Sequence, residues 1–120
     1  MPSYPIIFHD KDRIKITISP INEYDHSINI EFILDFDLFH EIIGIEILNL
    51  KHIAGEHCLD QIEQVIDSSG QNLSSTYDPD SDSFYLQISD ELSTEQQAVD
   101  GLLIINNIGN ILGFKADLPS

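Results

Sequence analysis

Strict alternation of apolar and polar residues most restricts the fold of this chain. Residues 13–19 place Ile14, Ile16 and Ile18 on one face and polar side chains on the other. Residues 28–34 begin with the same alternation, and residues 41–50 carry isoleucine at every second position from 43 to 47. A period of two residues is typical of a half-buried β-strand. We therefore predict three strands in the first half of the chain.

The second half of the chain repeats this order. Residues 83–88, 101–105 and 111–116 predict three further strands, and the Asn- and Gly-rich residues 106–110 predict a hairpin turn. Phe84 lies 70 residues after Ile14, and Leu112 lies 69 residues after Ile43. We therefore expect degenerate internal repeats, at about 6–50 and 75–118, each forming a three-stranded antiparallel β-meander.

A short helix is expected between the repeats. Leu59, Ile62, Val65 and Ile66 recur at helical spacing, and Gly70 suits the left-handed position that follows a helix. This helical connector spans about residues 57–69, and a further helical turn is expected over 93–97. The predicted fold class is α+β, mainly β, with two tandem three-stranded antiparallel β-meanders and one short helix between them. A length of 120 residues fits a single domain over 1–120, built as two packed sheets or as one continuous sheet.

The formal net charge of −16 limits the partners of this chain. Asp and Glu number 21 against 5 Lys and Arg, and after Leu59 only Lys115 opposes the acids. Such a field repels phosphates and anionic lipid and speeds encounter with basic proteins. We therefore expect a basic protein partner, no direct nucleic acid and no membrane; acidity that serves only solubility is the alternative. No apolar run reaches the roughly 18 residues of a membrane helix and no secretory signal is visible, so the cytoplasm is the expected location.

Motifs for metal binding and catalysis are incomplete. Residues 78–82 are similar to the start of a calcium loop, but Ser83 and Ser89 stand where that loop needs glycine and glutamate, so an Asp-rich turn is expected. His52, His57 and Cys58 supply fewer ligands than a typical zinc site needs, and exposed histidines around a buried cysteine are expected. No glycine-rich elbow or oriented base accompanies a nucleophile. We therefore predict no catalytic residue, no metal and no cofactor.

The segment from Leu34 to Glu41 is the best candidate for a binding surface. It is expected at a hairpin between two strands, yet it carries apolar side chains among acids. Apolar residues on an acidic rim are typical of a protein-binding patch, and aromatic residues that fold back onto the core are the alternative. The predicted partner-binding residues are Asp35, Phe36, Asp37, Leu38, Phe39, Asp78, Asp80 and Asp82.

Several segments together resemble a known family. Residues 77–86 have a Tyr-Asp start, an Asp four residues later and an aromatic-rich strand, and residues 100–104 and 109–114 follow as a middle strand and a hairpin. This order resembles the small bacterial proteins catalogued as domain of unknown function 2283, present here as two degenerate copies, and residues 43–48 match the family's ending in the first half. Lys115 departs from the pattern, because the family usually has Glu there. The resemblance implies a small β fold. It also implies an antitoxin or another neutralising role, because members are often encoded beside a small basic toxin-like protein.

Charge and resemblance together predict a non-enzymatic acidic protein-interaction module that binds a basic protein partner, as an antitoxin-like protein or a regulatory subunit. A nucleic-acid mimic that inhibits a DNA- or RNA-binding protein is one alternative, and a structural component of a larger assembly is another. A small hydrolase or metal-dependent enzyme is a third alternative. Exposed edge strands also allow a homodimer. Binding to a basic partner should weaken steeply with salt.

Overall fold

The computed structural model describes residues 4–22 and 25–118, which form eight strands and two helices. In chain order these are β1 (Ile6–His9), β2 (Arg13–Thr17), β3 (His26–Phe36), β4 (Ile42–Leu48), α1 (Leu50–Ala54), α2 (Glu56–Ser68), β5 (Ser74–Asp78), β6 (Ser83–Gln87), β7 (Glu95–Ile105) and β8 (Ile111–Asp117). The prediction of a mainly β chain with a helix near its middle is confirmed.

The described strands form one antiparallel sheet in the order β1-β2-β8-β7-β3-β4-β6-β5. The prediction of two tandem meanders is wrong in its pairing, because within this sheet β2 lies between β1 and β8 and not beside β3. Likewise β6 pairs with β4 of the first half and not with β7. Alternation decides which face of a strand is buried but not which strand lies next to it. Each half of the chain therefore completes the sheet of the other.

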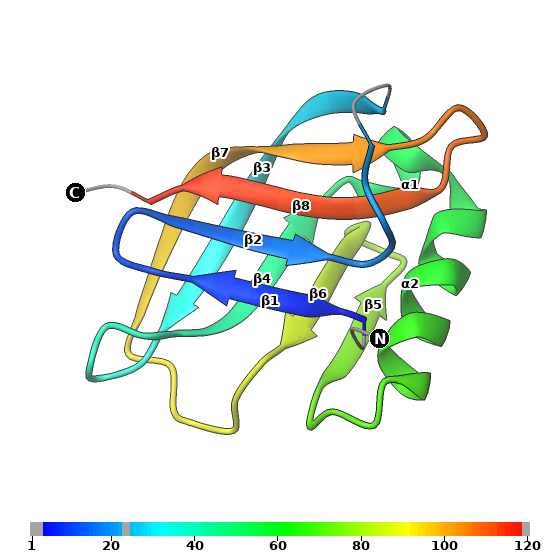
Figure 1. The fold of residues 1–120 in the computed structure, drawn as a ribbon. Helices are drawn as coiled ribbons and strands as arrows, with labels where there is room; N and C mark the ends of the chain where they lie inside the picture. Colours follow the sequence, from blue (N-terminus) through cyan, green and yellow to red (C-terminus); the bar gives the residue numbers. More distant parts are fainter. Residues whose placement is uncertain (1–3, 23–24, 119–120) are drawn as a thin grey trace.

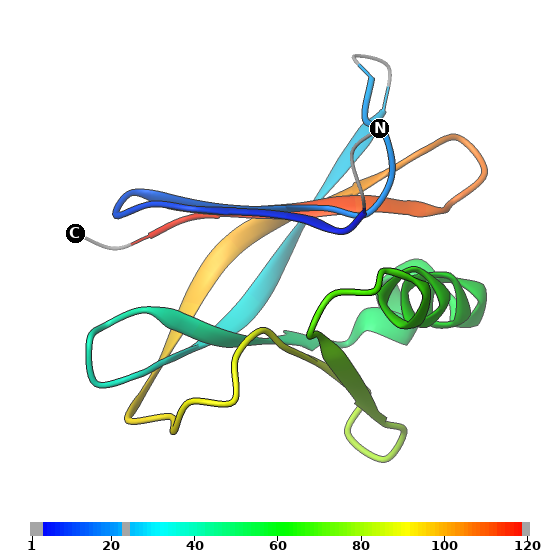
Figure 2. The same cartoon turned by 60° about the horizontal axis from the view of Figure 1, so that its bottom comes forward.

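The sheet curls until its two ends lie over each other (Figure 1). In Figure 2, β1, β2 and β8 form one layer and β4, β5 and β6 form the other, while β3 and β7 cross between them. Of the two arrangements considered, the single continuous sheet is the one observed. Inward-facing apolar side chains form one core, whose largest fully buried members are Phe32, Phe36, Phe84, Ile16, Ile18, Leu34, Ile47, Leu50, Ile62, Ile66, Leu103 and Ile111.

The strand order is symmetric: when β1 to β4 are exchanged with β5 to β8 in turn, the same order is obtained, read from the other edge of the sheet. The centre of this approximate two-fold relation lies between β3 and β7, where Glu31 pairs with Asp100. Equivalent irregularities occur on both sides of it, since the register shifts at residues 35/36 of β3 and at residues 104/105 of β7. The N–H groups of Ile18 and Ile88 donate equivalent hydrogen bonds, to Leu112 at 2.7 Å and to Ile43 at 2.8 Å.

The two hairpin turns of β3–β4 and β7–β8 have the same construction. Asp37 Oδ1 accepts N–H bonds from the residues two and four positions later, and Asn106 Oδ1 does the same in the second turn. Each turn contains one residue at positive φ, which is His40 at 62° in the first and Gly109 at 84° in the second. The predicted hairpin over 106–110 is therefore confirmed.

Helix α2 covers one end of the curled sheet (Figure 1). Its buried face presents Cys58, Leu59, Ile62 and Ile66 to the core. The side-chain amide of Gln61 donates to the Ile111 carbonyl and accepts from the Ile111 N–H, both at 2.9 Å, which satisfies the first residue of β8. The predicted connector at 57–69 corresponds to α2 within one residue at each end.

Two local predictions are wrong. Residues 49 and 50 were expected in a strand, but Asn49 adopts a left-handed conformation at φ 61° and starts the additional helix α1. The helical turn expected over 93–97 is the start of strand β7, because Glu95 pairs with Phe36 and Gln96 with Asp35. In both places a contact with a distant segment overrides the local propensity.

Candidate functional site

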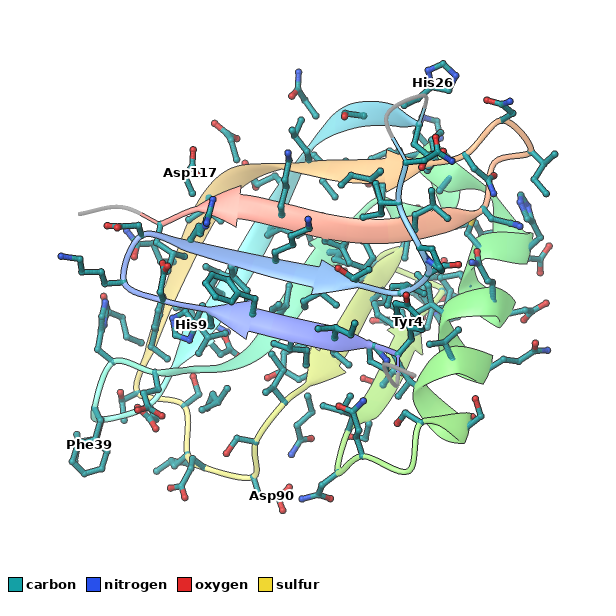
Figure 3. All side chains as sticks on the ribbon, viewed as in Figure 1. Tyr4, His9, His26, Phe39, Asp90 and Asp117 are labelled. Atoms are coloured by element: carbon teal, nitrogen blue, oxygen red, sulfur yellow. The ribbon has the colours of Figure 1, made fainter. Side chains whose placement is uncertain are left out.

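The turn between β3 and β4 presents two large apolar side chains to solvent. Leu38 is 80% exposed and Phe39 is 82% exposed. Both are held there because Asp37 closes the turn with its carboxylate, and the Asp37 N–H donates to the Glu41 carbonyl at 2.9 Å. Figure 3 shows Phe39 projecting from a corner of the molecule on the side away from α2. The turn is thus a fixed apolar tip and not a collapsed part of the core.

Asp35 and Phe36 lie behind this tip and are both buried. The Asp35 carboxylate accepts hydrogen bonds from the Tyr85 hydroxyl at 2.7 Å and from the Gln96 side chain at 2.8 Å. Burial, and then the bond to Asp35, raise the pKa of Tyr85 above its ordinary range. The Tyr85 ring lies over Gly44, where any side chain would overlap it. Of the five candidates from 35 to 39, Asp35 and Phe36 are therefore buried and support the exposed tip from beneath.

His40 joins the tip to the start of β7. Its ring stacks on Phe36 with a centroid separation of 4.4 Å and an interplanar angle of 7°. Its Nδ1 atom lies 3.6 Å from a carboxylate oxygen of Glu95. The Thr94 N–H donates to the Phe36 carbonyl at 2.9 Å, so the loop that carries the 80% exposed Leu92 is attached to the same corner.

The structure places Asp78, Asp80 and Asp82 at the opposite end of β4 from this tip, because Ser83 pairs with Leu48. Asp78 accepts the Asp80 N–H at 3.0 Å, which confirms the expected Asp-rich turn. Asp82 accepts the N–H groups of Lys51 and His52 at the start of α1, and the Tyr77 hydroxyl at 2.7 Å. The predicted site residues therefore do not form one surface.

The pKa values of Asp82 and Tyr77 are shifted in opposite directions. Desolvation opposes the charge on Asp82, but the bonds from Tyr77 and from the two backbone N–H groups outweigh it and hold the pKa of Asp82 below its usual value. The bond to Asp82 raises the pKa of Tyr77 to about 12. The arrangement stabilises the ionised aspartate and the neutral tyrosine, and it fastens the β5–β6 turn to α1.

A groove of about 770 Å³ lies beside the apolar tip, where the β1–β2 turn faces the β3–β4 turn. We call it the open-end groove, because α2 covers the other end of the sheet (Figure 1). Its lining combines apolar side chains, three carboxylates, one lysine and two histidines: His9, Asp10, Lys11, Asp12, Phe36, Phe39, His40, Glu41, Gln97 and Leu118.

Sequence reasoning missed most of this groove. Asp10, Asp12 and Leu118 meet Phe39 only because the sheet curls, and no local pattern joins residues so far apart. Asp10 accepts the N–H groups of Asp12 and Arg13, and these bonds lower its pKa. The groove therefore holds an aspartate whose ionised form is stabilised by backbone hydrogen bonds, beside the exposed ring of Phe39.

Cys58 is buried and belongs to the packing of α2. Its Sγ atom lies 2.9 Å from the Ala54 carbonyl and 3.0 Å from the Gly109 carbonyl. Burial raises the pKa of this thiol, whereas a cysteine nucleophile needs a lowered pKa. His52 and His57 are exposed, which confirms the expected arrangement of surface histidines around a buried cysteine.

Within residues 4–22 and 25–118, no group of three or more His, Cys, Asp or Glu side chains is arranged to hold a metal ion. In the same ranges, no helix has the length and apolar character needed to cross a membrane.

Comparison with known proteins adds no relative to this picture. The chain matches no family model, no curated protein and no solved structure. The resemblance to domain of unknown function 2283 therefore stays a prediction, and the function is inferred from the geometry of the chain itself.

Proposed function

We propose that this chain is a non-enzymatic protein-interaction module whose open-end groove binds a basic segment of a partner protein. The observation that carries the proposal is the exposed Phe39 beside the carboxylates of Asp10, Asp12 and Glu41. A lysine or arginine side chain has both a cationic head and an apolar stem. The groove offers carboxylates to the head and aromatic surface to the stem.

Three physical effects favour the binding of a basic segment. The net charge of −16 attracts a basic chain before contact. An exposed aromatic face binds cations with about 0.5–1 kcal/mol at a solvated site. Leu38 and Phe39 supply apolar surface that is already held outward by the Asp37 turn, so little ordering is needed on binding.

We also propose that the chain contains an internal repeat and acts as an antitoxin-like or regulatory protein, as the sequence predicted. The matched strand order and the matched turns support two copies of one unit within the chain. The apolar tip is not matched in composition, because Leu38 and Phe39 correspond to Asn107 and Ile108 in the second turn. We infer that the first copy carries the partner site, and that an antitoxin-like protein or a regulatory subunit of the bacterial cytoplasm is the form this function takes.

A peptide titration tests the proposal. A short synthetic peptide of lysine, arginine and leucine is added to the isotopically labelled chain, and backbone amide shifts are followed by NMR. We expect saturable shifts at residues 9–12, 37–41 and 97, with affinity that falls steeply as salt rises. The variant Phe39→Ser should weaken binding about tenfold, because it removes an aromatic anchor at the centre of the contact.

The matched control is Ile108→Ser, which removes a similarly exposed apolar residue (75% against 82% for Phe39) from the equivalent turn of the second half. It should leave the peptide affinity unchanged. Shifts spread over the whole acidic surface, or equal losses in the two variants, would contradict the proposed site. Capture from host lysate then identifies the natural partner, and competition by nucleic acid distinguishes a nucleic-acid mimic.

A further inference from the structure

Most of the few cations of this chain lie together on the outer face of the sheet. The chain has 5 Lys and Arg residues, and Arg13, Lys15 and Lys115 line one groove on β1, β2, β7 and β8. Lys15 alternates with the buried Ile14 and Ile16, and its side chain is exposed, so it faces away from the core. The groove is therefore on the opposite face of the β1–β2 hairpin from the open-end groove.

Lys15 and Lys115 are direct cross-strand partners in the pairing of β2 with β8. Cβ atoms of such partners lie about 4.5–5.5 Å apart, and like charges directly opposite each other destabilise a sheet. Among the described residues the one contact within 4 Å between a basic side chain and a carboxylate joins His40 to Glu95, so neither lysine has a carboxylate at that distance. Asp100 and Asp117 line the same groove, but neither contacts the two adjacent lysines within the distance of an ion pair.

The approximate two-fold relation shows that the lysine pair is not required by the fold. The equivalent positions on the other side of the sheet are Tyr85 and Glu46, which are also cross-strand partners. There the tyrosine hydroxyl is bonded to Asp35, and the surface carries negative charge. The same backbone thus accommodates a neutral and acidic pair, and the two lysines are specific to one half.

The groove around the lysines has both apolar and polar side chains in its lining. It measures about 600 Å³, and Phe8 and Leu102 flank the lysines on the same face of the sheet. Phe8 is 46% exposed, and the Arg13 guanidinium lies over its ring at 5.6 Å from the centroid. The row Phe8, Lys15, Lys115, Leu102 and Asn29 crosses five adjacent strands, because each residue pairs with the next.

We propose that this groove binds a small organic phosphate, with the phosphate between Lys15 and Lys115 and a flat apolar body against Phe8 and Leu102. The phosphate would neutralise the lysine pair through charge-assisted hydrogen bonds. Asp100 and Asp117 at the rim would accept hydrogen bonds from hydroxyl or amino groups of the body. A net charge of −16 opposes a long polyanion, so the structure favours a ligand with a single phosphate over a nucleic acid.

Adenosine monophosphate is a suitable probe, because it joins one phosphate to a flat ring system. We expect a saturable NMR titration of the full chain with amide shifts at residues 8, 13–15, 102 and 115. The double variant Lys15→Gln with Lys115→Gln should weaken binding about tenfold or more, because both charge-assisted contacts are lost. The matched control Lys51→Gln removes a cation that lies on α1 and should leave the affinity unchanged.

A second measurement separates the site from general charge effects. Adenosine monophosphate should raise the Tm of the wild-type chain above its value in sodium chloride of equal ionic strength, and it should not do so for the double variant. Shifts that do not saturate, equal affinity for adenosine without phosphate, or equal affinity in the double variant and the Lys51→Gln control would overturn the proposal.

Discussion

Asp35 is the one buried charged side chain among the described residues, with an exposed fraction of 6%. A buried carboxylate is costly unless hydrogen-bonding groups surround it. Tyr85 and Gln96 provide these groups from β6 and β7, the neighbouring strands on either side of the β3–β4 pair. The carboxylate thus links three segments of the sheet directly beneath the Leu38–Phe39 tip.

The variant Tyr85→Phe tests this link. It removes the hydroxyl donor and leaves the ring over Gly44, so the buried carboxylate loses one of its two side-chain partners. We expect the free energy of unfolding to fall by about 1–3 kcal/mol, measured by urea denaturation. In the Asp35→Asn background the same substitution should cost less, and additive losses in this double-mutant cycle would show that the two groups do not interact.

At this scale the sequence predicted exposure only in part. For Leu38 and Phe39 two interpretations were open, an exposed patch with an acidic rim and a hairpin folded back onto the core, and both residues are exposed. Phe36 was grouped with them, but it is buried in the core, because it lies on the same face of β3 as Phe32 and Leu34. β3 extends two residues beyond the predicted strand of 28–34, so the alternation that buries Leu34 also buries Phe36.

Among the secondary-structure elements, α1 depends on a residue from a distant turn. This five-residue helix has no side-chain cap of its own, and Asn49 at its start makes no capping bond. Asp82, in the β5–β6 turn, accepts the N–H groups of Lys51 and His52, which lie 31 and 30 positions earlier in the chain. Helix α1 is therefore stabilised by hydrogen-bond acceptors from the β5–β6 turn.

Replacing Asp82 with Asn should therefore destabilise the protein in a pH-dependent way. The pKa of Asp82 in the folded chain lies below its ordinary value of 3.8. Its ionised form thus stabilises the fold fully above that value, and this contribution is lost as the pH falls through the folded pKa. We expect Asp82→Asn to lower the free energy of unfolding at pH 7 by about 1 kcal/mol and to have little effect in strong acid.

Asp80→Asn is the control for this measurement, because it removes a charge from the same turn but no hydrogen bond to α1. It should leave stability within about 0.5 kcal/mol of the wild type at both pH values. An equal loss for the two variants would mean that the general charge of the turn, and not the cap, is responsible.

Most strands were predictable from alternation, whereas the edge strands were not. The residues of β2 and β6 alternate between apolar and polar, and both strands occur where they were expected. The residues of β5 are Ser, Ser, Thr, Tyr and Asp, which are typical of a polar linker, and the strand exists because it pairs with β6. An exposed edge needs few apolar residues, so its sequence carries little signal.

At the scale of the whole molecule, the two halves are interlocked. β2 is completed by β8, and β6 is completed by β4, so the hairpin of each half lies on the last strand of the other. The open-end groove depends on this arrangement, because the β1–β2 turn and the β3–β4 turn face each other across the curl. Non-local pairing of this kind has no local sequence signature, which is why the groove could not be predicted.

Fragments test the interlocking directly. Residues 1–69 and residues 70–120 are produced separately and studied at moderate salt, where repulsion between the two acidic pieces is screened. We expect neither fragment alone to form a stable monomer, because each lacks the strand that completes its hairpin. An equimolar mixture should recover a 1:1 complex with the β circular dichroism of the full chain. A fragment that folds alone as a monomer with dispersed amide resonances would contradict the observed pairing.

The position of β8 has a consequence for synthesis of the protein. β8 (Ile111–Asp117) is the direct neighbour of β2 (Arg13–Thr17), although the whole of β3 to β7 lies between them in the sequence. The ribosome must therefore make all the strands from β3 to β8 before the β1–β2 hairpin finds its partner. Chains dominated by such distant pairings fold slowly, and their unpaired strands are open to wrong partners in the meantime. The strong negative charge that attracts a basic partner in the folded state would also keep these unfinished chains apart from one another.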